Sequence, residues 1–156
     1  MSFSVRGASA LNGLQGLRWR FNQGVMAGGV RVVRIVTDRA RQGMTGSHSG
    51  RHYTNSFRTI GHGAGRRIFP VAGGLPNQSS APGEYSASQS GAMLGSIGGS
   101  NSLWQIRVWI SAPHAQYQEY GTDRMAARPT MGNAIRDTHE QVATELGQTV
   151  WQFLRV

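Results

Sequence analysis

The residue types most often used in catalysis are concentrated between Tyr117 and Met131, in the segment YQEYGTDRMAARPTM. The segment contains two carboxylates, Glu119 and Asp123. Two carboxylates can act as general acid and general base only when their surroundings separate their pKa values. Because the same segment contains Arg124 and Arg128, we expect ion pairs instead, with Glu119 bound to one of these two arginines.

The other residues that could catalyse a reaction or bind a metal ion lack the spacing that such a site requires. His48, His52 and His62 are surrounded by Gly and Arg, and their spacing matches no structural zinc pattern. The chain has no cysteine, which excludes disulfides, thiolate metal ligands and a cysteine nucleophile. No GxSxG elbow, Walker loop or strand–GxGxxG–helix unit occurs. The sequence therefore predicts no catalytic, cofactor-binding or metal-binding residue, and a protein that is not an enzyme.

The chain is strongly basic, and its charge is unevenly distributed. The formal net charge is +9, every basic residue is arginine, and most of the arginines precede residue 68. The arginines form no run, and RWRF at 18–21 is the best interleaving of aromatic residues with arginine. We therefore expect the charge to face an acidic protein partner, with non-specific DNA binding as the alternative function. The expected partner-facing residues are Arg31, Arg34, Arg39, Arg41, Arg66 and Arg67.

The N-terminal third of the chain is predicted to be mainly helical. An alternating segment over 3–7 predicts a short strand. Leucines at helical spacing predict a helix over 8–21, and a second apolar stripe predicts another over 22–44. The N-terminus lacks the apolar region of a signal peptide. No apolar run approaches the roughly 20 residues that a membrane helix needs, so we expect no membrane association.

Residues 43–92 are rich in Gly, Ser, Asn, Pro and Arg and predict an extended arm or loop. After this arm, residues 95–111 predict a β-hairpin in which GGSNS turns. Trp104, Ile106, Val108 and Ile110 would face the core of the protein.

The C-terminal third predicts a short helical turn that ends at Gly121, followed by a long helix from about Thr130. Met131, Ile135, Val142, Leu146 and Val150 would form the apolar stripe of this helix. The whole chain therefore predicts one α+β domain over 1–156. In this domain an antiparallel sheet with a hairpin packs against N-terminal helices and a long C-terminal helix.

Two stretches of the chain resemble a known family. SAPGEYSASQSGAMLGSI (80–97) resembles the pattern APGExPA…SGxLxxSI, and HAQYQEYGTDRMAARPTMGNAI (114–135) resembles YAxYxExGTxxMxARPFMxPA. Together, with a strand hairpin between them, they are similar to the tail-completion or neck proteins of long-tailed phages, the putative tail-component family of lambdoid phages. The sequence departs from these patterns at four positions, which are Ser86, His114, Thr130 and Asn133.

The resemblance implies a structural virion protein that is located in the neck and assembles in the host cytoplasm. It implies a homo-oligomeric ring, most readily of six subunits. Head-completion, stopper or adaptor proteins would lie on one side of the ring and tail terminator or tube proteins on the other. DNA would pass through the ring lumen.

The resemblance also gives the segment around residue 120 a role in holding the assembly together. Gly121 lets the backbone turn after Tyr120, and Pro129 starts the last helix. A loop built in this way is rigid, which suits a joint better than a mobile lid. The predicted interface and structural loop comprises Glu119, Tyr120, Gly121, Thr122, Arg128 and Pro129.

Overall fold

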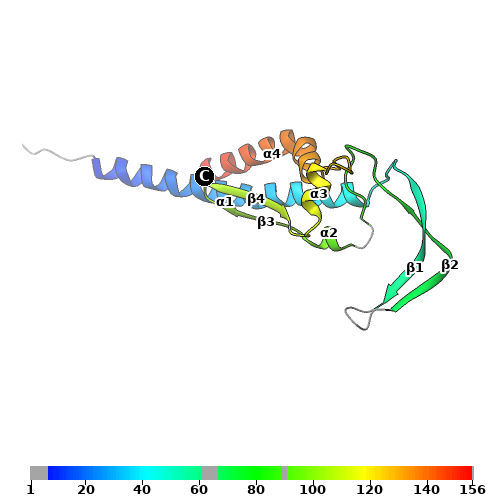
Figure 1. The fold of residues 1–156 in the computed structure, drawn as a ribbon. Helices are drawn as coiled ribbons and strands as arrows, with labels where there is room; N and C mark the ends of the chain where they lie inside the picture. Colours follow the sequence, from blue (N-terminus) through cyan, green and yellow to red (C-terminus); the bar gives the residue numbers. More distant parts are fainter. Residues whose placement is uncertain (1–6, 61–66, 89–90, 156) are drawn as a thin grey trace, which may run out of the picture.

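A computed structural model describes residues 7–60, 67–88 and 91–155 of the chain. Its long first helix is the spine of the molecule, with a second long helix along one side and a β-hairpin along another (Figure 1). This arrangement confirms the predicted α+β fold. The helices are α1 (Gly7–Thr45), α2 (Ala92–Gly95), α3 (Ala115–Tyr120) and α4 (Met131–Leu154). The strands are β1 (His52–Ile60), β2 (Arg67–Gln78), β3 (Ile97–Ser102) and β4 (Gln105–Ile110).

Helix α1 is one continuous helix of 39 residues, so the prediction of two separate helices is wrong. The predicted strand over 3–7 lies almost wholly outside the described residues, and Gly7 already belongs to α1. Two glycines of α1 are positions where α4 approaches it closely. A Cβ atom at Gly24 would lie 2.9 Å from the Cα of Val150, and one at Gly28 would lie 2.7 Å from Leu146 Cδ1. The close packing of α4 on α1 therefore depends on these glycines, and this packing stabilises α1 as one continuous helix.

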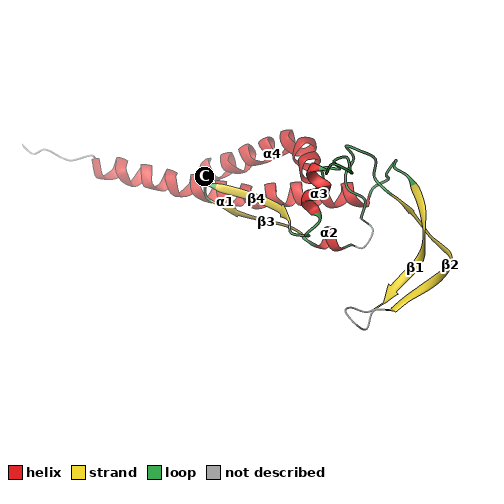
Figure 2. Ribbon diagram, in the orientation of Figure 1, coloured by secondary structure: helices red, strands yellow, loops and turns green. Residues whose placement is uncertain are grey.

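Strands β3 and β4 form the predicted hairpin, antiparallel, with Ile97 opposite Ile110 (Figure 2). The turn consists of Leu103 and Trp104 and follows Ser102, so the prediction that GGSNS turns is wrong. Val108 and Ile110 pack against the core, as predicted. Ile106 and Trp104, nearer the turn, are exposed, so the prediction that they face the core is wrong. Only the part of the hairpin far from its turn is covered.

The core lies where α1, α4 and the hairpin meet. It is built from Val36, Ala40, Met44, Met93, Ile97, Ala115 and Ala134. Helix α4 buries Ala134, Thr138 and Thr149, whereas Ile135 is 51% exposed. Four residues of the predicted stripe pack inward. Met131 and Val142 pack against the core, and Leu146 and Val150 lie against Gly28 and Gly24 of α1. The prediction is therefore wrong only for Ile135.

The arm predicted over 43–92 contains regular structure, which the sequence analysis did not predict. Strands β1 and β2 pair antiparallel, with an irregularity between Asn55 and Phe57. The two strands extend away from the body at the end opposite the start of α1 (Figure 1). The composition of this segment predicted a loop, but β2 has one free edge, and the prolines within it, Pro70 and Pro76, are tolerated on an edge strand.

Candidate functional site

The predicted loop between α3 and α4 is fixed by the carboxylate of Glu119. Its Oε2 accepts hydrogen bonds from the backbone N–H groups of Thr130 (2.8 Å) and Met131 (3.0 Å), and its Oε1 accepts one from Gly132 (2.7 Å). These N–H groups belong to the first turn of α4 and have no acceptor within the helix. A negative charge at this end of a helix is also favourable. The predicted pairing of Glu119 with Arg124 or Arg128 is therefore wrong, because three converging N–H groups already occupy the carboxylate.

Gly121 ends α3 with a backbone conformation that favours glycine, as predicted. Its φ is 77°, and its N–H donates to the carbonyl oxygen of Tyr117 at 2.9 Å. A Cβ at this position would lie 2.7 Å from the carbonyl oxygen of Met125. Thr122 and Met125 exchange two backbone hydrogen bonds of 2.8 and 3.1 Å. The loop is therefore compact, while the side chain of Tyr120 at its start is 83% exposed.

Arg128 connects this loop to the segment that follows the arm. Its backbone N–H donates to the carbonyl oxygen of Gln118 at 2.7 Å, and its Nε donates to that of Ser80 at 2.7 Å. Pro129 lies one residue before the N-cap, Thr130, so its predicted place in the first turn of the helix is wrong. The first residue of α4 is Met131, although Thr130 before it already has helical backbone dihedral angles.

Three residues that depart from the resembled family pattern are buried and form the contact between residues 80–88 and α4. Ser86 donates its hydroxyl proton to the carbonyl oxygen of Arg128 at 2.9 Å. The backbone N–H of Ser86 donates to Thr130 Oγ1 at 3.3 Å, and Asn133 Nδ2 donates to the carbonyl oxygen of Gly83 at 2.9 Å. Buried polar groups need such partners, so these residues depend on one another.

Glu84 holds the base of the arm. Its carboxylate accepts hydrogen bonds from the hydroxyl and the backbone N–H of Ser49, the second at 3.1 Å, and from the N–H of Ala81 at 2.8 Å. The Ser49 hydroxyl, then the two N–H groups, lower the pKa of Glu84 to about 2. The N–H of Ser79 donates to the carbonyl oxygen of Arg51 at 3.1 Å and closes the base.

A second polar cluster, missed by the sequence analysis, joins α1 to α4 through Tyr85. The Tyr85 hydroxyl donates to Asp137 Oδ2 at 2.7 Å, and Arg39 donates to the same oxygen from Nε (3.1 Å) and Nη2 (2.5 Å). The Tyr85 hydroxyl, and then Arg39, lower the pKa of Asp137. Burial, and then the bond to Asp137, raise the pKa of Tyr85 to about 12. The only signal in the sequence was the position of Tyr85 within the first resembled motif.

Most of the arginines predicted to face a partner contact their own chain. Arg31 pairs with Glu145 at 2.6 Å, and Arg39 pairs with Asp137. Arg41 donates to the carbonyl oxygen of Ile97 at 3.1 Å and to Asp38 at 3.3 Å. Arg34 also reaches Asp38, at 3.5 Å, but 84% of its side chain is exposed. Arg66 and the side chain of Arg67 lie outside the described part of the structure.

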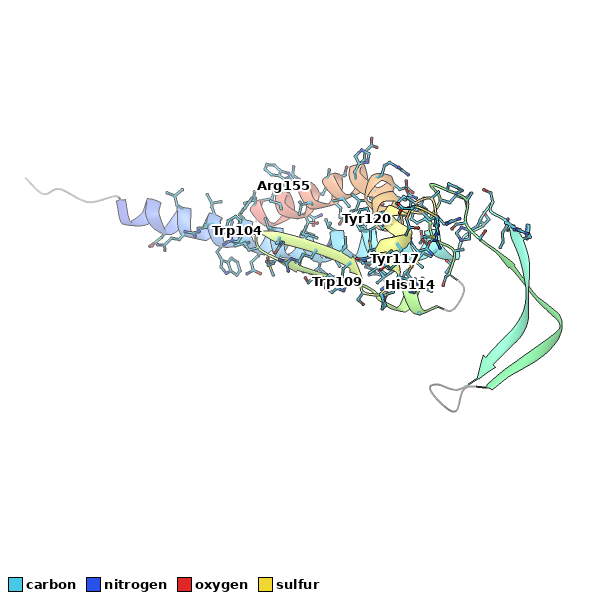
Figure 3. All side chains as sticks on the ribbon, in the orientation of Figure 1. Trp104, Trp109, His114, Tyr117, Tyr120 and Arg155 are labelled. Atoms are coloured by element: carbon cyan, nitrogen blue, oxygen red, sulfur yellow. The ribbon has the colours of Figure 1, made fainter. Side chains whose placement is uncertain are left out.

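A cleft beside the predicted loop is lined mainly by apolar residues. It has a volume of about 500 Å³ and lies between α3, the start of α4 and β4. We name it the α3–α4 cleft. Figure 3 shows Tyr117 and Tyr120 on α3, with Trp109 on the neighbouring hairpin. The lining residues are Val108, Ile110, Ala115, Gln116, Glu119, Tyr120, Met131, Gly132 and Ile135.

Within residues 7–60, 67–88 and 91–155, no three His, Asp or Glu side chains lie close enough to hold a metal ion. In the same ranges no helix is both long and apolar enough to cross a membrane. Comparison of the chain with protein-family models, curated proteins and solved structures finds no match.

Proposed function

We propose that this chain is a structural protein of the neck of a long-tailed phage particle. Six copies form a ring that joins the head connector to the tail, with head-completion, stopper or adaptor proteins on one side. Tail terminator or tube proteins lie on the other side. The resemblance of residues 80–97 and 114–135 to neck proteins supports this proposal.

The observation that carries the proposal furthest is the shape of the chain. Hairpin β1–β2 extends from one end of the body, and the N-terminal part of α1 extends from the other (Figure 1). Leu14, Leu17 and Trp19 on that part of α1 are about half or more exposed. Apolar side chains on a projecting helix are typical of a surface that is covered in an assembly.

The loop between α3 and α4 is held rigid by hydrogen bonds, which suits a joint between subunits and does not suit a mobile lid. Glu119, Gly121 and Arg128 each bind backbone groups of a neighbouring segment. A lid needs hinge residues that change their backbone dihedral angles, and such residues cannot be fixed by several hydrogen bonds. The exposed Tyr120 then stands on a rigid support, as an interface residue should.

The alternative function, non-specific DNA binding, draws on the net charge of +9. It requires arginines that are available to phosphates. Arg31, Arg39 and Arg41 are instead engaged with acids or carbonyl oxygens of the same chain. We therefore favour protein partners, with DNA passing through the lumen of the ring.

Imaging of the particle neck tests the proposal. We expect a ring of six copies between the head connector and the tail, located by a tag fused after Val156. Particles made without the chain should accumulate as separate full heads and finished tails. Joined particles in the absence of the chain, or a neck that contains no copies, would refute the proposal. Salt-sensitive DNA binding by the purified chain, with no copy in the neck, would favour the alternative.

A further inference from the structure

Strand β4 has an outer edge whose backbone groups are unpaired. The N–H of Ser111 donates to the carbonyl oxygen of Ser96 at 3.1 Å, which adds a hydrogen-bonded pair to the end of the β3–β4 ladder. Hydrogen-bonded and non-hydrogen-bonded pairs alternate along antiparallel strands. Ile106, Val108 and Ile110 therefore direct their backbone N–H and C=O groups away from β3. Within the described residues these groups have no backbone partner elsewhere.

The α3–α4 cleft lies along this edge. Val108 and Ile110 line it from β4, and Tyr120, Met131 and Ile135 line it from α3 and the start of α4. Two of the three residues with unpaired backbone groups are therefore also cleft residues. An extended segment that hydrogen-bonds to β4 places alternate side chains toward such a cleft, which is the arrangement of β-strand addition.

The arm has a free edge of the same kind on β1. The N–H of Ser79 donates to the carbonyl oxygen of Arg51 at 3.1 Å, so the same alternation directs the backbone groups of Thr54 away from β2. Pro76 lies opposite Thr54, and its outward position on β2 has no N–H to donate. Strand β1 contains no proline, so its outward N–H groups are all present. The arm can therefore accept a further strand on β1 more readily than on β2.

Beyond the irregularity in the arm, a second proline marks the outward positions. Proline within a sheet occurs where its missing N–H would face away from the neighbouring strand. Pro70 lies opposite Phe57, so Phe57 and, two residues on, Thr59 direct their backbone groups outward from β1. Ile68, opposite Thr59, directs its backbone groups outward from β2.

The arm needs a further strand more than the body does. Strands β1 and β2 form a separate two-stranded sheet that extends away from the body (Figure 1). A two-stranded hairpin alone is marginally stable in water, and a sheet usually needs three or more strands. The missing strand has to come from outside the arm.

A second copy of the chain fits this need, because the chain offers both halves of the contact. The outer edge of β2 lacks donors at its prolines, and at β3 Arg41 Nη2 already donates to the outward carbonyl oxygen of Ile97 at 3.1 Å. The edges of β1 and β4 remain, and in one copy they lie far apart (Figure 1). Pairing of two β1 edges would leave β4 unpaired, whereas pairing of β1 with β4 satisfies both edges.

We propose that β1 of one copy pairs with β4 of the next copy, beside its α3–α4 cleft. The two hairpins then form one four-stranded sheet in the order β2, β1, β4 and β3. The contact joins two different surfaces, and its repetition closes into a ring when the rotation allows. The inference rests on the proposed function in one respect, since it names the contact between neighbouring subunits of the proposed ring.

Disulfide cross-linking of the full chain tests the contact, since the sequence contains no cysteine. Each variant carries Arg107→Cys, at an exposed position of β4, and one further cysteine at a single position within 52–59 of β1. Opposite residues of paired strands have Cα atoms about 4.5–5.5 Å apart, which a disulfide can bridge. Only bonds between copies raise the mass on a non-reducing gel, so these bonds alone are scored.

We expect cross-linking at alternate positions of β1, because the side chains of neighbouring residues lie on opposite faces of a strand. These positions should react about tenfold more than the positions between them, as expected when a contact raises the effective concentration of two groups. The matched control moves the cysteine from Arg107 to Glu140 on α4, whose side chain is 90% exposed. That series should show no alternation.

Sedimentation of the chain without cysteines provides a second measurement. A variant with Thr54→Pro and Thr59→Pro loses two outward donors of β1, so copies should associate about tenfold more weakly. The matched control is Ile68→Pro, because it changes the residue opposite Thr59 but removes a donor only from the outer edge of β2. Association of this control should equal that of the wild type.

Four results would overturn the inference. They are the absence of cross-links at every β1 position, equal cross-linking at adjacent positions, and equal weakening of association by Ile68→Pro. The fourth is a dimer linked through β1 cysteines alone, with no bond to Arg107→Cys, which would mean that two arms pair with each other. The proposed function fails independently, if the alternating pattern is found and the particle neck still contains no copy of the chain.

Discussion

Glu119 at the end of α3 and Gly132 in the first turn of α4 are joined by a hydrogen bond of 2.7 Å between Oε1 and the backbone nitrogen. The same carboxylate also binds the N–H groups of Thr130 and Met131. One side chain therefore closes the loop at both ends and caps the long helix. Glu119 therefore stabilises the fold, and the fold in turn fixes the positions of Tyr120 and of the α3–α4 cleft.

Replacement of Glu119→Ala should lower the free energy of unfolding by about 1–2 kcal/mol, because three N–H groups lose their acceptor. Glu119→Gln should cost less, since the amide oxygen still accepts hydrogen bonds. Urea denaturation followed by circular dichroism measures both. The control is Glu140→Ala on α4, where 90% of the side chain is exposed, and it should change stability by less than about 0.5 kcal/mol. Equal losses at the two positions would contradict the capping role.

Gly121→Val should be among the most damaging single changes, at about 2–4 kcal/mol. The φ of 77° disfavours a β-branched residue, and the added Cβ would lie 2.7 Å from the carbonyl oxygen of Met125. Thermal denaturation of the purified variant measures the loss. Gly147→Ala is the matched comparison, because no atom lies within 4 Å of its Cβ position on α4. That change should stabilise the chain by about 0.5–1 kcal/mol. A Gly121→Val variant as stable as the wild type would refute the argument.

Glu84 should make the stability of the chain sensitive to acid. Its pKa is about 2 in the folded chain, against an ordinary value of 4.5. Between these values the unfolded chain binds more protons, so the contribution of Glu84 is complete above about pH 4.5 and is lost as the pH falls toward 2. Melting temperatures measured across this range should fall less steeply for Glu84→Gln than for the wild type. Parallel curves for the two proteins would show that Glu84 makes no such contribution.

Removal of hairpin β1–β2 should leave the body folded. The N–H of Ser79 already donates to the carbonyl oxygen of Arg51, so these two residues can be joined after deletion of 52–78 without a long linker. The melting temperature should change little, because the two strands pair mainly with each other (Figure 1). Under the proposed function, the shortened chain should no longer join heads to tails. A shortened chain that is unfolded would show that the arm is part of the core.

The sequence alone predicted those features of the fold that depend on a residue's own backbone or on residues close to it in the chain. Gly121 had to turn the chain and has the positive φ expected of it. The alternating residues before Ser111 predicted β4, and the apolar period after Thr130 predicted α4. Each of these signals depends on residues within a few positions of one another, so it does not require knowledge of the tertiary fold.

Contacts between distant segments were decided only by the tertiary structure. Glu119 had two nearby arginines in the sequence, but folding brings the free N–H groups of α4 to its carboxylate first. The packing of α4 on Gly24 and Gly28 could not be predicted from the sequence. Arg31 and Arg39 read as charges for a partner, yet folding places Glu145 and Asp137 beside them. A sequence lists donors, acceptors and small residues, and the packing of remote segments determines which of them meet.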